Sequence, residues 1–184
     1  MYLKNKYNIM HTTAIRHGIF AAGIMILVLV VLYFLFSPYT LLDLGEVMGY
    51  ATMVIAMSMI FIGIKRYRDN ELNGCITFKQ AFGLGAYIAA IGSFIYGIFE
   101  GLFYEFSDFK ELYLDFYIDK IKNSGQSPEA IHQQLQEMNQ QFAMWDSPFM
   151  MGLLMFLTVF IIGLLIALIS AAILKKYPET VAQT

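Results

Sequence analysis

Cysteine and charge are both scarce in this sequence. Cys75 is the one cysteine, which excludes an intramolecular disulfide and a cysteine metal cluster, and we expect it to be a bystander thiol in a loop. Charged residues make up 14% of the chain and hydrophobic residues 58%, whereas soluble domains have roughly 25% and 45–50%. Because a soluble fold with so little polar surface would not stay dispersed, the composition predicts a membrane protein.

Sequence signals for chemistry are also missing. The net charge of −2 gives no basic field, so nucleic acid is not an expected partner. His11, His17 and His132 are spread along the chain without the spacing of metal ligands. There is no P-loop, no H-E-x-x-H and no G-x-S-x-G motif. We therefore expect no catalytic, cofactor-binding or metal-binding residues, and a protein that is not an enzyme.

Four apolar runs are each long enough to cross a bilayer. A helix of about 20 residues spans the roughly 30 Å hydrocarbon core. The runs predict an all-α membrane protein with a single membrane domain, residues 1–184, and spans at about residues 18–36, 45–64, 78–104 and 148–174. The first run is too long for the apolar part of a signal peptide, so we expect it to remain as a span.

The basic residues favour one orientation in the membrane. If both chain ends and the loop after the second span face the cytoplasm, nine basic residues lie inside and three outside, as the positive-inside rule requires. The inside set is Lys4, Lys6, Arg16, Lys65, Arg66, Arg68, Lys79, Lys175 and Lys176. Within it, the cytoplasmic basic loop of Lys65, Arg66, Arg68 and Lys79 could bind anionic lipid, although the topology rule alone accounts for these charges.

The loop before the third span and the polar region after it carry signals for turns and helix starts. Gly74 predicts a turn, and Thr77 with Gln80 predicts a capping box. Residues 107–145 predict an amphipathic helical hairpin outside the membrane, in which Ser127-Pro128 begins the second helix. Its other signals are a capping box from Ser107 or Asp108 to Glu111, an apolar stripe of Ile131, Leu135, Met138 and Phe142, and an aromatic belt of Tyr104, Tyr113, Tyr117 and Trp145.

Small residues recur at every fourth position of the third span. The positions are Ala81, Gly85, Ala89, Ser93, Gly97 and Gly101. Such a row lets helix backbones approach closely, and it drifts around the helix by about 40° per step. We therefore expect the third span to be central and to touch at least two neighbours. The row is compatible with packing within one bundle and with packing between two copies.

Glu100 is the one acid well inside an apolar run. An intramembrane carboxylate is a hypothesis for a proton- or cation-binding site. Because Glu100 lies near the outer end of its span, a side chain that reaches water is the favoured alternative.

Several motifs resemble a known family. The segment 49–69, G-Y-A-T-M-V-I-A-M-S-M-I-F-I-G-I-K-R-Y-R-D, is similar to a bacterial membrane-protein family known only as domain of unknown function 4199. Residues 73–74, 76–78, 81–82 and 163–171 resemble the same family. The resemblance covers roughly residues 14–177. It implies four spans, a polar region before the last span and an inner-membrane location, but no activity.

The sequence therefore favours a non-enzymatic inner-membrane protein that acts through helix–helix or protein–protein contacts. Its partners would be the lipid bilayer and either a second copy or another membrane protein. The alternative is a small transporter or channel subunit for a proton, cation or small solute, with Glu100 in the path.

Overall fold

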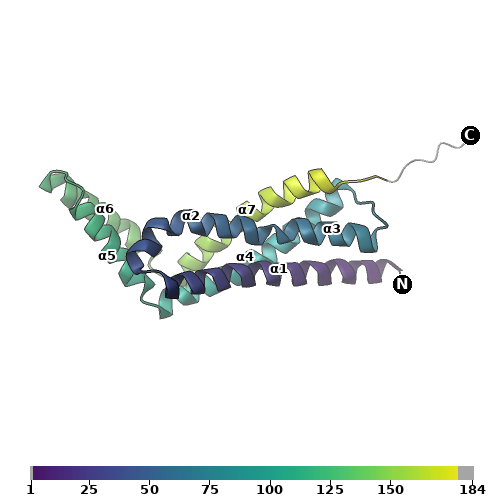
Figure 1. Cartoon of the computed structure of the whole chain (residues 1–184), viewed down its shortest axis with the longest axis horizontal. Coiled ribbons are helices and arrows are strands. Elements are labelled where there is room, and N and C mark those ends of the chain that lie inside the picture. Colours follow the sequence, from purple (N-terminus) through teal and green to yellow (C-terminus); the bar gives the residue numbers. More distant parts are fainter. Residues whose placement is uncertain (1, 178–184) are drawn as a thin grey trace, which may run out of the picture.

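The computed structural model describes residues 2–177, except for the side chains of residues 2–8, 38, 39, 41, 144 and 145. The predicted cytoplasmic bases Lys4 and Lys6 and the predicted belt residue Trp145 lie outside the described side chains. Within the described range the chain is all-helical and contains no strand (Figure 1). The helices are α1 (Tyr2–Leu35), α2 (Pro38–Met57), α3 (Met59–Glu71), α4 (Phe78–Phe106), α5 (Phe109–Lys122), α6 (Pro128–Trp145) and α7 (Pro148–Leu174).

Four stretches are long and apolar enough to cross a membrane. They are Ile9–Leu35, Leu42–Glu71, Phe78–Phe106 and Pro148–Leu174. The last has the predicted bounds, but α1 begins at Tyr2 and α3 ends at Glu71, well outside the predicted runs. These helices extend further because backbone hydrogen bonds continue a helix through polar residues once the apolar run ends.

The second apolar stretch is interrupted at Ser58, between α2 and α3. The Ser58 hydroxyl donates to the Ile55 carbonyl oxygen over 2.6 Å, and the Ser58 backbone N–H is shared between the carbonyls of Val54 and Ile55. Serine hydroxyls that bond back to the preceding turn are a known cause of helix bending. The uninterrupted apolar run 45–64 had predicted no such break.

Two of the predicted helix starts are confirmed, and one predicted capping box does not form. The capping box of Thr77 and Gln80 is confirmed, because each side chain accepts the other residue's backbone N–H. Ser127 caps α6 as predicted. The predicted box from Ser107 or Asp108 to Glu111 is wrong, since Asp108 makes no side-chain cap. Ser107 does satisfy one N–H at the start of α5, because its oxygen accepts the Phe109 backbone N–H over 3.3 Å, while its hydroxyl donates to the Phe103 carbonyl oxygen at the end of α4.

Helix α4 occupies the centre of the bundle and packs against α1, α3 and α7, which confirms the expectation of at least two neighbours. At one end, α5 and α6 lie side by side and project past the other helices (Figure 1). The start of α1, the end of α3 and the end of α7 gather at the opposite end (Figure 1). The two ends of the described chain therefore lie on the same side of the bundle.

The loop between α3 and α4 is tied to the end of α7. Ile76 and Lys176 exchange two backbone hydrogen bonds of 2.9 Å each. Arg68 Nη1 also donates to the Leu174 carbonyl oxygen over 3.3 Å. The turn predicted at Gly74 is confirmed, because its φ of 80° is one that glycine adopts without strain. Ile76 of this loop is also only 1% exposed, so backbone bonds and a buried side chain together fix the loop on the bundle.

Candidate functional site

The row of small residues on α4 faces α7 of the same chain. A Cβ atom added at Gly97 would lie 2.7 Å from the Gly152 carbonyl oxygen, and one added at Gly163 would lie 2.7 Å from the Ala89 Cβ. Gly85 meets Ala167 in the same way, and Gly101 faces the backbone of Pro148. The row is therefore occupied within the bundle, and it does not by itself indicate a partner protein.

The remaining members of the row are also buried. Ala81 and Ser93 are fully shielded from solvent, and the Ser93 hydroxyl donates to the Ala89 carbonyl oxygen over 2.7 Å. A Cβ added at Gly85 would also lie 3.1 Å from side-chain atoms of both Ile60 and Ile64 on α3. One end of the row thus meets α3 as well as α7.

The four basic residues of the predicted cytoplasmic loop lie in different surroundings. Lys65 and Arg66 are exposed on α3, and Lys79 is exposed in the first turn of α4. Arg68 is half-buried, where its Nε donates to Asp69 Oδ1 over 2.6 Å. The four side chains therefore do not form one uniform basic patch, and Arg66 lines a pocket between α1 and α3.

Glu100 has a hydrogen-bond partner that the sequence analysis did not name. The Tyr96 hydroxyl, one turn earlier on α4, donates to Glu100 Oε1 over 2.5 Å. Tyr96 is 5% exposed, and Glu100 is half-buried. The i, i+4 spacing of a tyrosine and an acid was visible in the sequence, but the same spacing is frequent in helices without such a bond.

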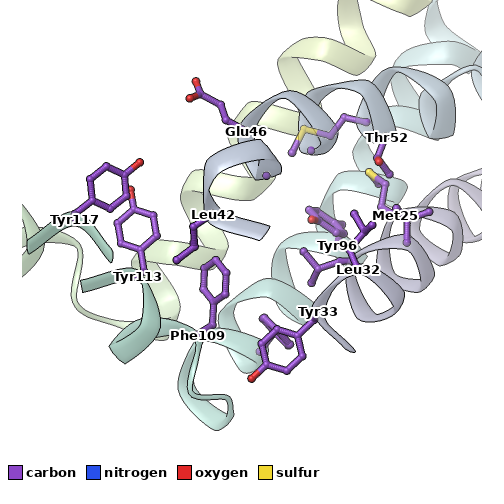
Figure 2. Close-up of a pocket in the computed structure, with 16 residues that line it drawn as sticks. Met25, Leu32, Tyr33, Leu42, Glu46, Thr52, Tyr96, Phe109, Tyr113 and Tyr117 are labelled. Carbon is purple, nitrogen blue, oxygen red and sulfur yellow. The ribbon is translucent and has the colours of Figure 1, made fainter. Parts of the chain in front are cut away.

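A cavity of about 370 Å³ lies between α1, α2, α4 and α5 (Figure 2). Figure 2 shows Leu42 of α2 and Phe109 of α5 within it, with Tyr113 and Tyr117 of α5 at one end and Glu46 pointing away. The lining residues are Met25, Val28, Leu29, Leu32, Tyr33, Leu42, Gly45, Glu46, Gly49, Thr52, Met53, Tyr96, Phe103, Phe109, Tyr113 and Tyr117.

Two glycines of α2 leave the space unfilled. An ideal Cβ at Gly45 or Gly49 meets no atom within 4 Å, so this face of α2 does not pack closely on its neighbours. The Thr52 hydroxyl is engaged in its own helix, where it donates to the Met48 carbonyl oxygen over 2.8 Å. The α2 wall therefore presents mostly apolar surface to the cavity.

A few polar side chains line this cavity, two of them at one end (Figure 2). Tyr96, with its bond to Glu100, lies on the α4 side. Tyr113 and Tyr117 of α5 have ring centroids 4.5 Å apart. Burial, followed by a hydrogen bond with Tyr117, raises the pKa of the Tyr113 hydroxyl, which keeps it protonated as a donor. The described lining holds no histidine, cysteine or lysine.

This arrangement has the character of a ligand-binding cavity. Ligand sites are typically apolar cavities of about 300–1,000 Å³ with a few polar groups that fix orientation. The cavity lies within this range of volume, and its lining is mostly apolar with a few hydroxyl groups. The cavity was not predicted from the sequence, because a glycine pair such as Gly45 and Gly49 predicts close helix contact as readily as empty space.

Comparisons with known proteins identify the family. No curated protein and no solved structure matches the chain. A family model described as "Protein of unknown function (DUF4199)" matches residues 16–176. This range includes the second-span and loop motifs as well as segment 163–171. The chain belongs to the DUF4199 family of proteins of unknown function.

Proposed function

We propose that the protein is a multi-pass protein of the bacterial inner membrane with both ends in the cytoplasm. Its four long apolar helices support membrane insertion, and the nine-to-three distribution of basic residues supports the orientation. The outer helical hairpin would then be formed by α5 and α6, on the periplasmic side.

Single cysteines in a Cys75→Ala background test this orientation. Asn73→Cys and Ser124→Cys place thiols at exposed positions at opposite ends of the bundle. In cells with a permeable outer membrane, an impermeant thiol reagent should label Ser124→Cys at once and Asn73→Cys only after the inner membrane is opened. The reverse order would overturn the proposed orientation.

We further propose that the protein works without catalysis, by binding the apolar part of a small membrane amphiphile. The observation that carries this proposal is the cavity between α1, α2, α4 and α5, with apolar walls and tyrosines at one end. An amphiphile would place its apolar portion against Met25 and Leu32 and its polar atoms near Tyr113 and Tyr117.

Photocrosslinking of the purified full chain with a diazirine-bearing short-chain glycerolipid tests this binding. Crosslinks should concentrate on Leu32, Leu42 and Phe109, compared with the exposed residues Leu165 and Ile173 of α7. Gly49→Leu should remove the cavity crosslinks, whereas Gly23→Leu, which also meets no atom within 4 Å but lies outside the lining, should not. Equal crosslinking of cavity and outer surface would contradict the proposal.

The bond between Tyr96 and Glu100 favours a second candidate, a transporter or channel subunit. Here Glu100 would bind a proton or cation next to the cavity. Proton or cation flux into liposomes should be lost in Glu100→Gln and retained in Glu105→Gln, an exposed acid of the same helix. Absence of flux for the unmodified protein would remove this candidate.

The projection of α5 and α6 beyond the bundle favours contact with a partner, either another membrane protein or a second copy (Figure 1). Extraction in mild detergent followed by light scattering and proteomics tests this proposal. We expect a stoichiometric partner or a homo-oligomer. A lone monomer would count against it.

A further inference from the structure

A second pocket lies at the opposite end of α1 from the cavity. It measures about 240 Å³, and adjacent turns of α1 and α3 form its two walls. The walls include Thr13, Arg16 and His17 of α1 and Arg66, Tyr67 and Glu71 of α3. The two arginines are far apart in the sequence, so only the pairing of α1 with α3 brings them to one pocket.

Two buried side chains present polar atoms to this pocket. His17 and Tyr67 are each 4% exposed. His17 Nδ1 donates to the Thr13 carbonyl oxygen over 2.8 Å, so Nε2 of the neutral ring is a free acceptor. The Tyr67 hydroxyl has no hydrogen-bond partner among the described residues. No fully buried side-chain nitrogen or oxygen among the described residues lacks a partner, so His17 Nε2 and the Tyr67 hydroxyl each keep some exposed surface, and both residues line the pocket.

The charge of the pocket suits an anion. Arg16 and Arg66 oppose one carboxylate, Glu71, which gives the lining a formal charge of +2 − 1 = +1. Neither arginine forms an ion pair with a described residue. Guanidinium groups present several N–H donors in a planar fork that matches the oxygens of a phosphate. A phosphate between the helices would satisfy both arginines and accept a hydrogen bond from the Tyr67 hydroxyl.

The mouth of the pocket adjoins an apolar surface. The guanidinium carbon of Arg16 lies 6.0 Å from the centre of the Phe20 ring. Phe20 and Ile19 are each 53% exposed, and Ile15 is 45% exposed. A molecule that fits both features carries a phosphate and apolar chains together, as a phospholipid does and inorganic phosphate does not.

We propose that this pocket binds the headgroup of an anionic phospholipid, with the phosphodiester between Arg16 and Arg66 and the acyl chains along Ile15, Ile19 and Phe20. A hydroxylated headgroup such as glycerol donates to His17 Nε2. This inference rests on the membrane location proposed above, and it concerns a different pocket from the amphiphile cavity.

Thermal unfolding of the purified full chain in mild detergent tests the proposal. Dioctanoyl phosphatidylglycerol should raise the unfolding temperature at lower concentration than dioctanoyl phosphatidylcholine. Arg16→Gln and Arg66→Gln should each weaken the phosphatidylglycerol effect about tenfold or more, because each removes charge-assisted hydrogen bonds. Lys65→Gln and Lys79→Gln, which remove exposed charges outside the pocket, should change it less than twofold.

Three results would overturn the proposal. The first is that the lysine variants lose as much binding as the arginine variants. The second is that the two lipids raise the unfolding temperature equally. The third is that inorganic phosphate at the same concentration raises it as much as phosphatidylglycerol does. If the arginine variants do not fold, Tyr67→Phe keeps the buried ring and removes the hydroxyl alone, and it should weaken binding several-fold. Cell fractionation tests the membrane location separately, so a membrane-bound chain without lipid preference would overturn this inference alone.

Discussion

Helix α4 borders two regions that are packed in opposite ways. On the side of α7, Gly97 and Gly152 bring the two backbones together, and an added Cβ would collide with a carbonyl oxygen at 2.7 Å. On the side of α1 and α2, Tyr96 and Phe103 border a cavity of about 370 Å³. Both regions contain glycine, since Gly45 and Gly49 line the cavity. Glycine therefore permits close contact but does not by itself produce it, because the facing helix must also approach.

The two regions are also expected to contribute differently, the α4–α7 contact to stability and the cavity to ligand binding. A lipid environment supplies no hydrophobic drive between helices, so close packing has to hold the bundle together. The α4–α7 contact provides such packing, whereas the cavity wall forgoes it. We therefore expect substitutions on the α7 side to affect folding and substitutions on the cavity side to affect ligand binding.

The largest effect is expected for Gly97→Leu. The new side chain would overlap the Gly152 carbonyl oxygen and the Phe156 Cβ, so the helices must separate. Overpacking of this kind costs about 1–3 kcal/mol and occasionally more, and we expect a loss of at least about 3 kcal/mol. Thermal unfolding in mild detergent measures it. Gly83→Leu on the same helix, which meets no atom within 4 Å, should be close to neutral, and equal losses in both variants would erase the distinction.

A smaller loss is expected for Tyr96→Phe at the border of the cavity. The change removes the hydroxyl that donates to Glu100 Oε1 and keeps the ring. Side-chain hydrogen bonds inside membranes contribute about 0.6–2 kcal/mol, so stability should fall by about 1 kcal/mol. Tyr50→Phe, at a tyrosine that is 50% exposed, provides the control. An unchanged unfolding temperature for Tyr96→Phe would show that the bond contributes nothing.

Gly49→Leu should scarcely change stability, because the added side chain enters empty space. Filling a cavity with apolar atoms gains packing contacts, so the unfolding temperature should stay level or rise slightly. Binding of the crosslinking glycerolipid should fall at least tenfold. A loss of stability as large as that of Gly97→Leu would show that α2 packs more tightly than the cavity implies.

The smallest effect concerns an ion pair at the base of α5. A hydrogen bond from Lys110 to Asp146 raises the pKa of the Lys110 amine above its ordinary 10.5. Because the folded pKa is raised, the stabilisation is fully present below about pH 10.5 and is lost as pH rises through the folded value. The difference in unfolding temperature between the unmodified chain and Lys110→Gln should therefore vanish at strongly alkaline pH. Lys122→Gln, which leaves the pair of Lys110 and Asp146 in place, is the control.

Local signals predicted much of the fold. The apolar runs gave the four long helices, and the last matched its predicted bounds of 148–174. The capping box of Thr77 and Gln80 and the turn at Gly74 formed as expected. Each of these features depends on residues within a few positions of one another, so their periodicity and hydrogen-bonding types are readable in the sequence.

The candidate sites could not be predicted in the same way. The row from Ala81 to Gly101 was evident, but not that α7 occupies it. Glu100 was evident as an unusual acid, but the cavity near Tyr96 was not. Arg16 and Arg66 were counted as topology signals, and nothing in their local sequence indicated a shared pocket.

The sequence by itself determined an all-helical chain of the DUF4199 family with four helices apolar enough to cross a membrane. The tertiary structure decided which helix faces meet, and through that pairing it placed the cavity and the arginine pocket. The physical reason is that helix formation follows from local hydrogen bonds and apolar spacing. The empty or charged space between helices depends instead on the shapes of residues far apart in the chain.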